Sequence, residues 1–146
     1  MGVNRLDKIH IAGGTPLHGT IRIQGSKNAA LPMMAAALLY PGVSILRNCP
    51  KIADVFCMEE ILCALGADTW WQEHDLYLDC TKADKTEISG IYTEKMRSSV
   101  ILLGVLLGRY GKASMGYPGG CVIGKRPVDP VSYTHLRAHE TGRNLV

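Results

Sequence analysis

The stretch "LLYPGVSILRNCP", residues 38–50, decides the fold class because it combines the end of a helix, a glycine, a strand and a closing proline. The stretch "LLGRYGKASMGYP", residues 106–118, repeats this order at the same spacing. A helix that turns through glycine into a strand, twice in one chain, is typical of a domain that mixes helices and strands. We therefore expect an α/β or α+β fold with a duplicated helix–strand unit.

The sequence around these two stretches predicts the remaining elements. Apolar residues at helical or alternating spacing predict helices at 29–39, 54–67 and 93–110, strands at 8–14, 19–25, 42–48 and 112–116, and a hairpin at 68–80 around the turn 73–75. Lys27 and Asn28 are then expected on the loop before the first helix, and Pro32 in its first turn. Asp54 is expected to cap the second helix, and Gly66 to end it.

Composition excludes several classes of protein. The 146 residues carry a net charge of +3, without the run of basic residues that binding to a nucleic-acid backbone requires. The sequence predicts neither a membrane span nor a signal peptide. Cysteines stand at positions 49, 57, 63, 80 and 121 without a C-x-x-C pair, and the histidines lack ligand spacing. We expect a cytoplasmic protein with reduced thiols and no metal site.

Two predicted helix starts carry cations. The segment "GSKNAALP" places Lys27 and Asn28 behind a glycine, and "EKMRSSV" places Arg97 before a long apolar helix. Both starts could bind one phosphate or carboxylate, because helix N-termini also present unpaired N–H groups. Taken alone, each motif is explained better by its alternative, a capped helix with a solvated lysine or a surface arginine.

A glycine-rich loop, "YPGGCVIGKRPVD" at 117–129, contains the fifth cysteine. Lys125 and Arg126 follow Cys121 closely and would favour its thiolate form. The other four cysteines lie in apolar patterns and are expected to be small core residues. From these residues alone, Cys121 is either a reactive thiol or an incidental loop residue.

Together, "GSKNAALP", "MRSS" and "PGGCVIGKRPVD" resemble, in this order, the enolpyruvyl transferase family, and the last motif resembles its UDP-sugar branch. The resemblance covers about residues 8–129. It implies a two-domain inside-out α/β barrel built from βαβαββ repeats, with the active site between the domains. Residues 1–24 would contribute strands to the second domain, and residues 25–129 would begin the catalytic domain.

The resemblance also implies substrates and residue roles. Phosphoenolpyruvate and UDP-N-acetylglucosamine would be the substrates, no metal or organic cofactor is implied, and the full-length protein would be monomeric. Lys27, Asn28 and Arg126 would bind phosphoenolpyruvate. Cys121 would be the proton donor or covalent partner and the target of the antibiotic fosfomycin. The UDP-sugar would contact Arg97 and the segment Arg126, Pro127, Val128 and Asp129.

The chain departs from the family after Asp129. The tail "PVSYTHLRAHETGRNLV", residues 130–146, does not continue the family pattern, and "SYTHLRAHET" resembles translated sequencing adapter. We expect a truncated chain whose tail is not native. This chain should be inactive alone, because the family's general base lies in the missing part. A native divergent terminus is the alternative. Shikimate-pathway chemistry on the same fold, or a UDP-sugar-binding domain without catalysis, are the competing functions.

Overall fold

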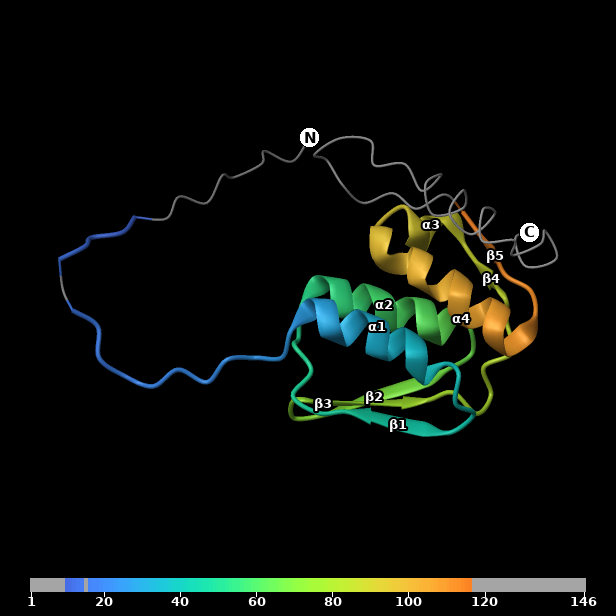
Figure 1. Cartoon of the computed structure of the whole chain (residues 1–146), viewed down its shortest axis with the longest axis horizontal. Coiled ribbons are helices and arrows are strands. Elements are labelled where there is room, and N and C mark those ends of the chain that lie inside the picture. Colours follow the sequence, from blue (N-terminus) through green and yellow to red (C-terminus); the bar gives the residue numbers. More distant parts are fainter. Residues whose placement is uncertain (1–9, 15, 117–146) are drawn as a thin grey trace, which may run out of the picture.

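The computed structural model describes residues 10–14 and 16–116 (Figure 1). Its elements, in chain order, are α1 (Lys27–Ala37), β1 (Val43–Leu46), α2 (Ala53–Ala64), β2 (Asp68–Gln72), β3 (Asp75–Asp79), β4 (Glu87–Ile88), α3 (Gly90–Thr93), the 3-10 helix η1 (Arg97–Val100), α4 (Ile101–Tyr110) and β5 (Ser114–Met115). This mixture of helices and strands confirms the predicted fold class.

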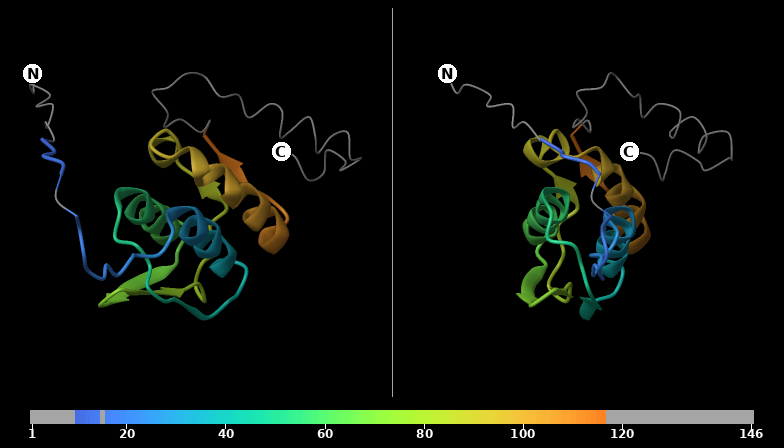
Figure 2. Two further views of the ribbon diagram at one scale, coloured as in Figure 1. Left: turned by 60° about the vertical axis from the view of Figure 1, so that its left-hand side comes forward. Right: turned by 90° about the vertical axis from the view of Figure 1, so that its left-hand side faces the viewer.

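Helices α1 and α2 cover the three-stranded sheet, and α3 and α4 lie on the side of these helices away from the sheet (Figures 1 and 2). The strand order is β1-β3-β2, and both pairs are antiparallel. Because side chains alternate along a strand, Leu76 and Leu78 of β3 are completely buried on one face of the sheet. On the opposite face, the ring of Tyr77 stacks on that of Trp70 of β2, with 5.2 Å between the ring centroids. The helices α1 and α2 pack on each other, and they contact β1 and β2 respectively.

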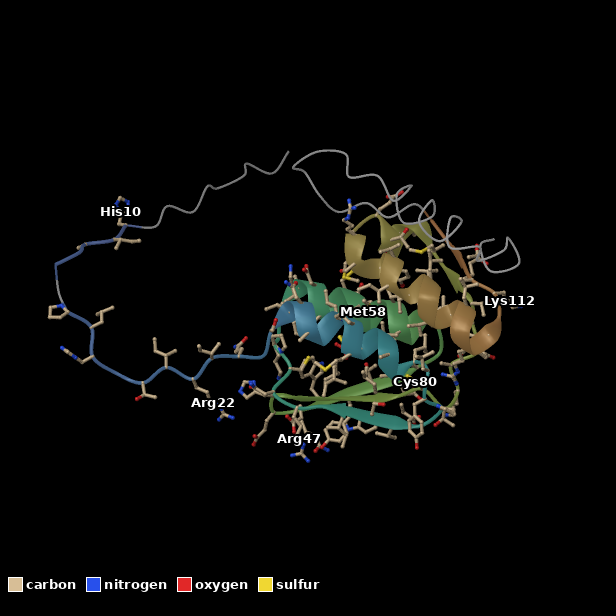
Figure 3. The ribbon with its side chains drawn as sticks, viewed as in Figure 1. His10, Arg22, Arg47, Met58, Cys80 and Lys112 are labelled. Carbon is tan, nitrogen blue, oxygen red and sulfur yellow. The ribbon has the colours of Figure 1, made fainter. Side chains whose placement is uncertain are left out.

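The core extends from the three-stranded sheet through α1 and α2 to α4. The predicted apolar stripe of α2 is confirmed: Val55, Met58, Ile61, Leu62 and Leu65 are each at most 1% exposed. Met58 is labelled in Figure 3. Helix α1 packs against both α2 and α4. These contacts fix the orientation of α1, and hence of its first residues.

A second sheet contains the short parallel strands β4 and β5. The segment between them holds α3, η1 and α4, which makes it a helical crossover between parallel strands. The repeated stretch is therefore a helix followed by a strand in both copies, α1–β1 and α4–β5, as predicted. The two copies differ in pairing, because β1 lies antiparallel to β3 and β5 lies parallel to β4. Strand β4 was not predicted from the sequence.

Arg109 joins the end of α4 to the rest of the domain. Its guanidinium donates hydrogen bonds to the carbonyl oxygens of Leu38, just after α1, and of Cys80, just after β3, the latter at 3.0 Å. The neighbouring Tyr110 hydroxyl donates to the Ala83 carbonyl. A planar guanidinium can serve two acceptors at once, so these bonds hold α4 beside α1.

The strands predicted at 8–14 and 19–25 are wrong for the residues that the structure describes there, because residues 10–14 and 16–25 contain no strand. A strand needs a hydrogen-bonding partner, and none of these described residues pairs with a strand of the domain. The described apolar side chains that gave the alternating pattern are exposed by 81–87%: Ile11, Ile21 and Ile23. Their alternation identified an extended segment without identifying a partner.

Three predicted helix boundaries also differ from the structure. Helix α1 begins at Lys27, so Lys27 and Asn28 are helical rather than on a loop, and Pro32 lies inside the helix. Asp54 lies in the first turn of α2, after the cap residue Ile52. The helix predicted at 93–110 is divided into α3, η1 and α4. Met96 separates the first two with extended backbone angles of φ −141° and ψ 112°.

Gly66 offers a test of the turn after α2. Its φ of +101° lies in the region that favours glycine, and an added Cβ would lie 3.1 Å from the Lys82 carbonyl oxygen. We expect Gly66→Ala to lower the free energy of unfolding by about 1–3 kcal/mol. Gly104→Ala is the matched control, because this exposed glycine lies inside α4 with no atom within 4 Å of the added Cβ. Gly104→Ala should raise the free energy of unfolding by up to about 1 kcal/mol.

Urea unfolding of both variants measures these changes. Equal stabilities for Gly66→Ala and the unmodified chain would contradict the assigned backbone conformation.

Candidate functional site

The candidate site is a pocket of about 470 Å³ between the N-terminus of α1, the start of α2 and the segment around η1. Lys27 and Asn28 line it from α1, Asp54 from α2, and Lys95 and Arg97 from the η1 side. The structure thus brings together three of the predicted binding residues, Lys27, Asn28 and Arg97. They come from segments about 70 residues apart in the sequence, and the packing of α1 against α4 brings these segments together.

Gly25 determines where α1 begins. Its N–H donates a hydrogen bond of 3.2 Å to the Asn48 carbonyl just after β1. A Cβ at residue 25 would lie only 2.3 Å from that carbonyl oxygen. Only glycine allows the backbone this close, so the glycine of "GSKN" anchors the start of α1 and places Lys27 at the pocket.

Lys27 forms an ion pair inside the pocket. Its Nζ lies 2.7 Å from Oδ2 of Asp54, and the two side chains are about half exposed, at 49% and 43%. Asp54 lies in the first turn of α2, where the helix dipole favours a carboxylate. From the sequence, Asp54 is expected only to cap α2. A carboxylate at a second helix start was the signal that could have identified it as a residue of the pocket.

The remaining charges around the pocket are positive. Lys95 precedes η1 and Arg97 begins it, and both line the pocket. Three cations and one carboxylate give this set of residues a charge of +2, which favours an anionic ligand. The Asn28 side chain adds an amide that can donate to a carboxylate or phosphate oxygen. Sequence reasoning missed Lys95, which stands two residues before the predicted Arg97.

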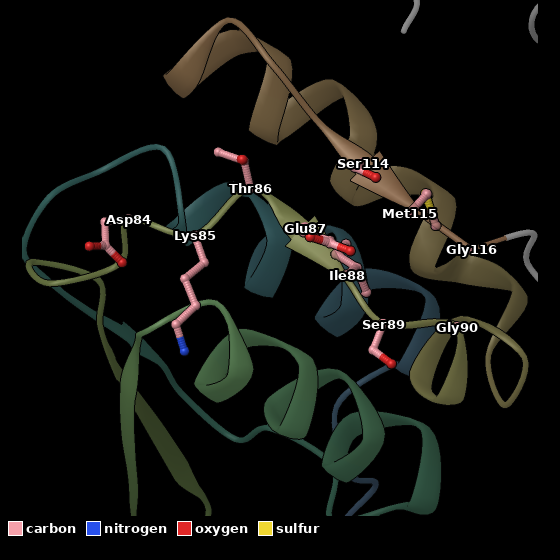
Figure 4. A pocket seen from close by; sticks show the side chains of 10 residues that line it. All are labelled: Asp84, Lys85, Thr86, Glu87, Ile88, Ser89, Gly90, Ser114, Met115 and Gly116. Carbon is pink, nitrogen blue, oxygen red and sulfur yellow. The ribbon is translucent and has the colours of Figure 1, made fainter.

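Five predicted site residues lie outside the residues that the structure describes: Cys121, Arg126, Pro127, Val128 and Asp129. Their roles therefore stay predictions. Strand β5 and Gly116, which lie just before them in the sequence, line a second pocket of about 740 Å³ with β4 (Figure 4). Although this pocket is larger, its charged residues are Asp84, Lys85 and Glu87, so it lacks a cluster of cations.

The four described cysteines are free thiols. Burial raises the pKa of Cys49 and Cys80, and also that of Cys57, where Glu60 adds to the effect and Lys95 opposes it. A raised pKa keeps these thiols protonated and unreactive at neutral pH. The expected core role is confirmed for Cys49 and Cys80. It is wrong for Cys63, which is exposed and accepts or donates a hydrogen bond of 3.4 Å with Thr69.

Two negative findings apply to the described part of the chain, residues 10–14 and 16–116. No group of three or more His, Cys, Asp or Glu side chains is arranged to hold a metal ion there. None of its helices has the length and apolar character needed to cross a membrane.

Comparison with known proteins places this chain in a family. The family model for EPSP synthase (3-phosphoshikimate 1-carboxyvinyltransferase) matches residues 11–140. The chain therefore belongs to the EPSP synthase family, the enolpyruvyl transferases. This confirms the predicted family.

Curated relatives include the UDP-N-acetylglucosamine 1-carboxyvinyltransferases of Coxiella burnetii strains Dugway 5J108-111 and RSA 493 / Nine Mile phase I. Each is 46% identical over 125 residues, which are 85% of this chain and 29% of the relative. The chain thus spans less than a third of the length of these relatives.

Among solved structures, the enolpyruvyl transferase NikO from Streptomyces tendae matches with a TM-score of 0.62 and 28% sequence identity, over 69% of this chain and 24% of that one. This likeness agrees with the predicted fold class. The described residues do not show the predicted barrel, which stays a prediction. The family match extends to residue 140, beyond the boundary predicted at 129, and that boundary stays a prediction.

Proposed function

We propose that this chain contains the first part of the catalytic domain of an enzyme that transfers the enolpyruvyl group of phosphoenolpyruvate to the 3′-hydroxyl of UDP-N-acetylglucosamine. One observation of the structure carries the proposal: Lys27, Asn28 and Arg97 line a single pocket. The similarity to the Coxiella burnetii proteins supports the UDP-sugar as acceptor. The reaction would supply peptidoglycan synthesis in the cytoplasm, where reduced thiols persist.

The chemistry divides between charge neutralisation and proton transfer. Phosphoenolpyruvate carries a phosphate and a carboxylate, and the ammonium of Lys27 and the amide of Asn28 are suited to bind them. Cys121 would donate a proton to the methylene carbon, so that the adjacent carbon becomes electrophilic. The sugar hydroxyl then adds to that carbon, losing its proton to a base. Loss of phosphate from that carbon, and of a proton from the adjacent methyl group, then re-forms the carbon–carbon double bond and completes the transfer.

The remaining predicted residues complete this assignment. Arg126 would help hold the phosphate, and Arg97 with the segment Arg126–Asp129 would contact the UDP-sugar. Residues 1–24 would join a second domain and residues 25–129 the catalytic one. The 146-residue chain by itself should release no phosphate from the two substrates, because it spans only 29% of the matched relatives.

The second candidate is transfer to shikimate 3-phosphate, which the description of the matching family model favours. The two candidates share the phosphoenolpyruvate site and differ in the acceptor. A chimeric enzyme distinguishes them. In it, residues 25–129 of this chain replace the aligned part of the Coxiella burnetii transferase, and each acceptor is offered in turn.

Fosfomycin labelling tests the role of Cys121. Because an epoxide reacts with a thiolate, we expect mass spectrometry of the chimera to find one adduct, on Cys121, and more of it when UDP-N-acetylglucosamine is present. Cys49, Cys57 and Cys80 serve as internal controls, since their raised pKa values should leave them unmodified. An adduct that persists in Cys121→Ser would show that another residue is the target.

A further inference from the structure

The Lys27–Asp54 ion pair lies where the proposed ligand would bind. Both residues line the same pocket, and the Lys27 ammonium is within hydrogen-bonding distance of the Asp54 carboxylate, at 2.7 Å. Lys27 is the first residue of α1, and the first turn of this helix contains no acidic residue. The positive end of a helix dipole disfavours a cation, so Asp54 is the group that offsets this effect for Lys27.

We propose that Asp54 is a positioning residue that acts through Lys27: it holds the ammonium at the pocket and competes with an anionic ligand for that ammonium. This inference rests on the proposed anion site and deepens it. An ammonium has three donors, so a ligand oxygen can bind beside Asp54 without displacing the lysine side chain.

When a ligand oxygen and the Asp54 carboxylate both accept hydrogen bonds from the Lys27 ammonium, their separation is unfavourable for the ligand. Two oxygens that accept from one ammonium lie about 4.5 Å apart, and like charges at that separation repel each other. Each charge carried by the ligand therefore competes with the carboxylate of Asp54. Both side chains are about half exposed, so either can move when the ligand arrives.

This arrangement has a consequence for the proposed reaction. Phosphate, the leaving group, would also bind Lys27, and a pocket of cations alone would retain it. Because Asp54 can take the ammonium back, it would lower the affinity for phosphate and favour its release. The other cations of the pocket, Lys95 and Arg97, come from a different segment, the one around η1.

A double-mutant cycle with inorganic phosphate tests the proposal on the 146-residue chain. Phosphate is titrated while the backbone amide signals of residues 27–28 and 97–98 are followed by NMR. We expect Asp54→Asn to tighten phosphate binding at least threefold, and Asp54→Glu, which keeps the charge, to bind like the unmodified chain. In a Lys27→Met background, Asp54→Asn should change the affinity by less than about 1.5-fold, because the coupling passes through the ammonium.

Three results would overturn the proposal. The first is phosphate affinity in Asp54→Asn that is unchanged or lower, and the second is a gain in affinity from Asp54→Asn that is as large in the Lys27→Met background as without it. The third is the absence of any phosphate-dependent change at these amides in both the unmodified chain and Asp54→Asn. Phosphate binding is measured without turnover, so this test is separate from that of the proposed function. A chimera that releases no phosphate from phosphoenolpyruvate would contradict the proposed function. It would not affect the conclusion that Asp54 and Lys27 are coupled in phosphate binding, which the double-mutant cycle tests separately.

Discussion

Replacing Lys27 with alanine should weaken the binding of phosphoenolpyruvate at least tenfold. A hydrogen bond between charged groups contributes about 1.5–3 kcal/mol, which corresponds to roughly a 10- to 100-fold change in affinity. The substitution also leaves Asp54 in the pocket without its partner at 2.7 Å, so that the pocket loses a positive charge and keeps a negative one. NMR titration of the chain with phosphoenolpyruvate measures the change.

Lys82→Ala is the matched control for this substitution. It removes the same charge from a side chain that is 82% exposed, that lies 3.9 Å from Asp68, and that does not line the pocket. We expect its affinity to stay within about twofold of the unmodified chain, because exposed charges are screened by solvent and salt. Equal losses in the two variants would mean that net charge, rather than the pocket, determines binding.

The second large effect concerns the core. Met34 of α1 is completely buried, and truncation to alanine should lower the free energy of unfolding by about 2–5 kcal/mol, because it leaves a cavity. A domain of this size has a total stability of about 5–15 kcal/mol, so this loss is a large part of it. Because α1 also places Lys27 at the pocket, Met34→Ala should weaken phosphoenolpyruvate binding as well.

The neighbouring residue provides the comparison. Met33 belongs to the same helix and has the same side chain, but it is 51% exposed. Met33→Ala should change the free energy of unfolding by less than about 0.5 kcal/mol, as is usual for surface positions. Urea unfolding of both variants measures the difference, and equal effects would contradict the packing of α1 against α2 and α4.

The sequence predicted those parts of the fold that depend only on residues close together in the chain. The stripe of α2, the hairpin of β2 and β3 and the end of α4 at Gly111 follow from apolar spacing and glycine conformation, and the structure confirms all three. Pairing between distant strands has no such local signal. Residues 19–25 therefore gave an incorrect strand, and β4, with only two residues, was missed.

The same distinction applies to the site. Sequence patterns identified Lys27 and Arg97 as cations near two helix starts, and tertiary packing then placed them in one pocket. Asp54 was overlooked as a pocket residue because its position in the sequence predicts a helix cap. Its distance of 2.7 Å from Lys27 depends on how α1 packs against α2, which no local pattern specifies.

Phosphate release by the chimera, with phosphoenolpyruvate and UDP-N-acetylglucosamine together, tests the central claim most directly. The account predicts release that requires both substrates, that is lost in Lys27→Ala and in Cys121→Ala, and that does not occur with shikimate 3-phosphate as acceptor. The Coxiella burnetii transferase itself is the positive control. A folded chimera that releases no phosphate, beside an active control, would contradict the account.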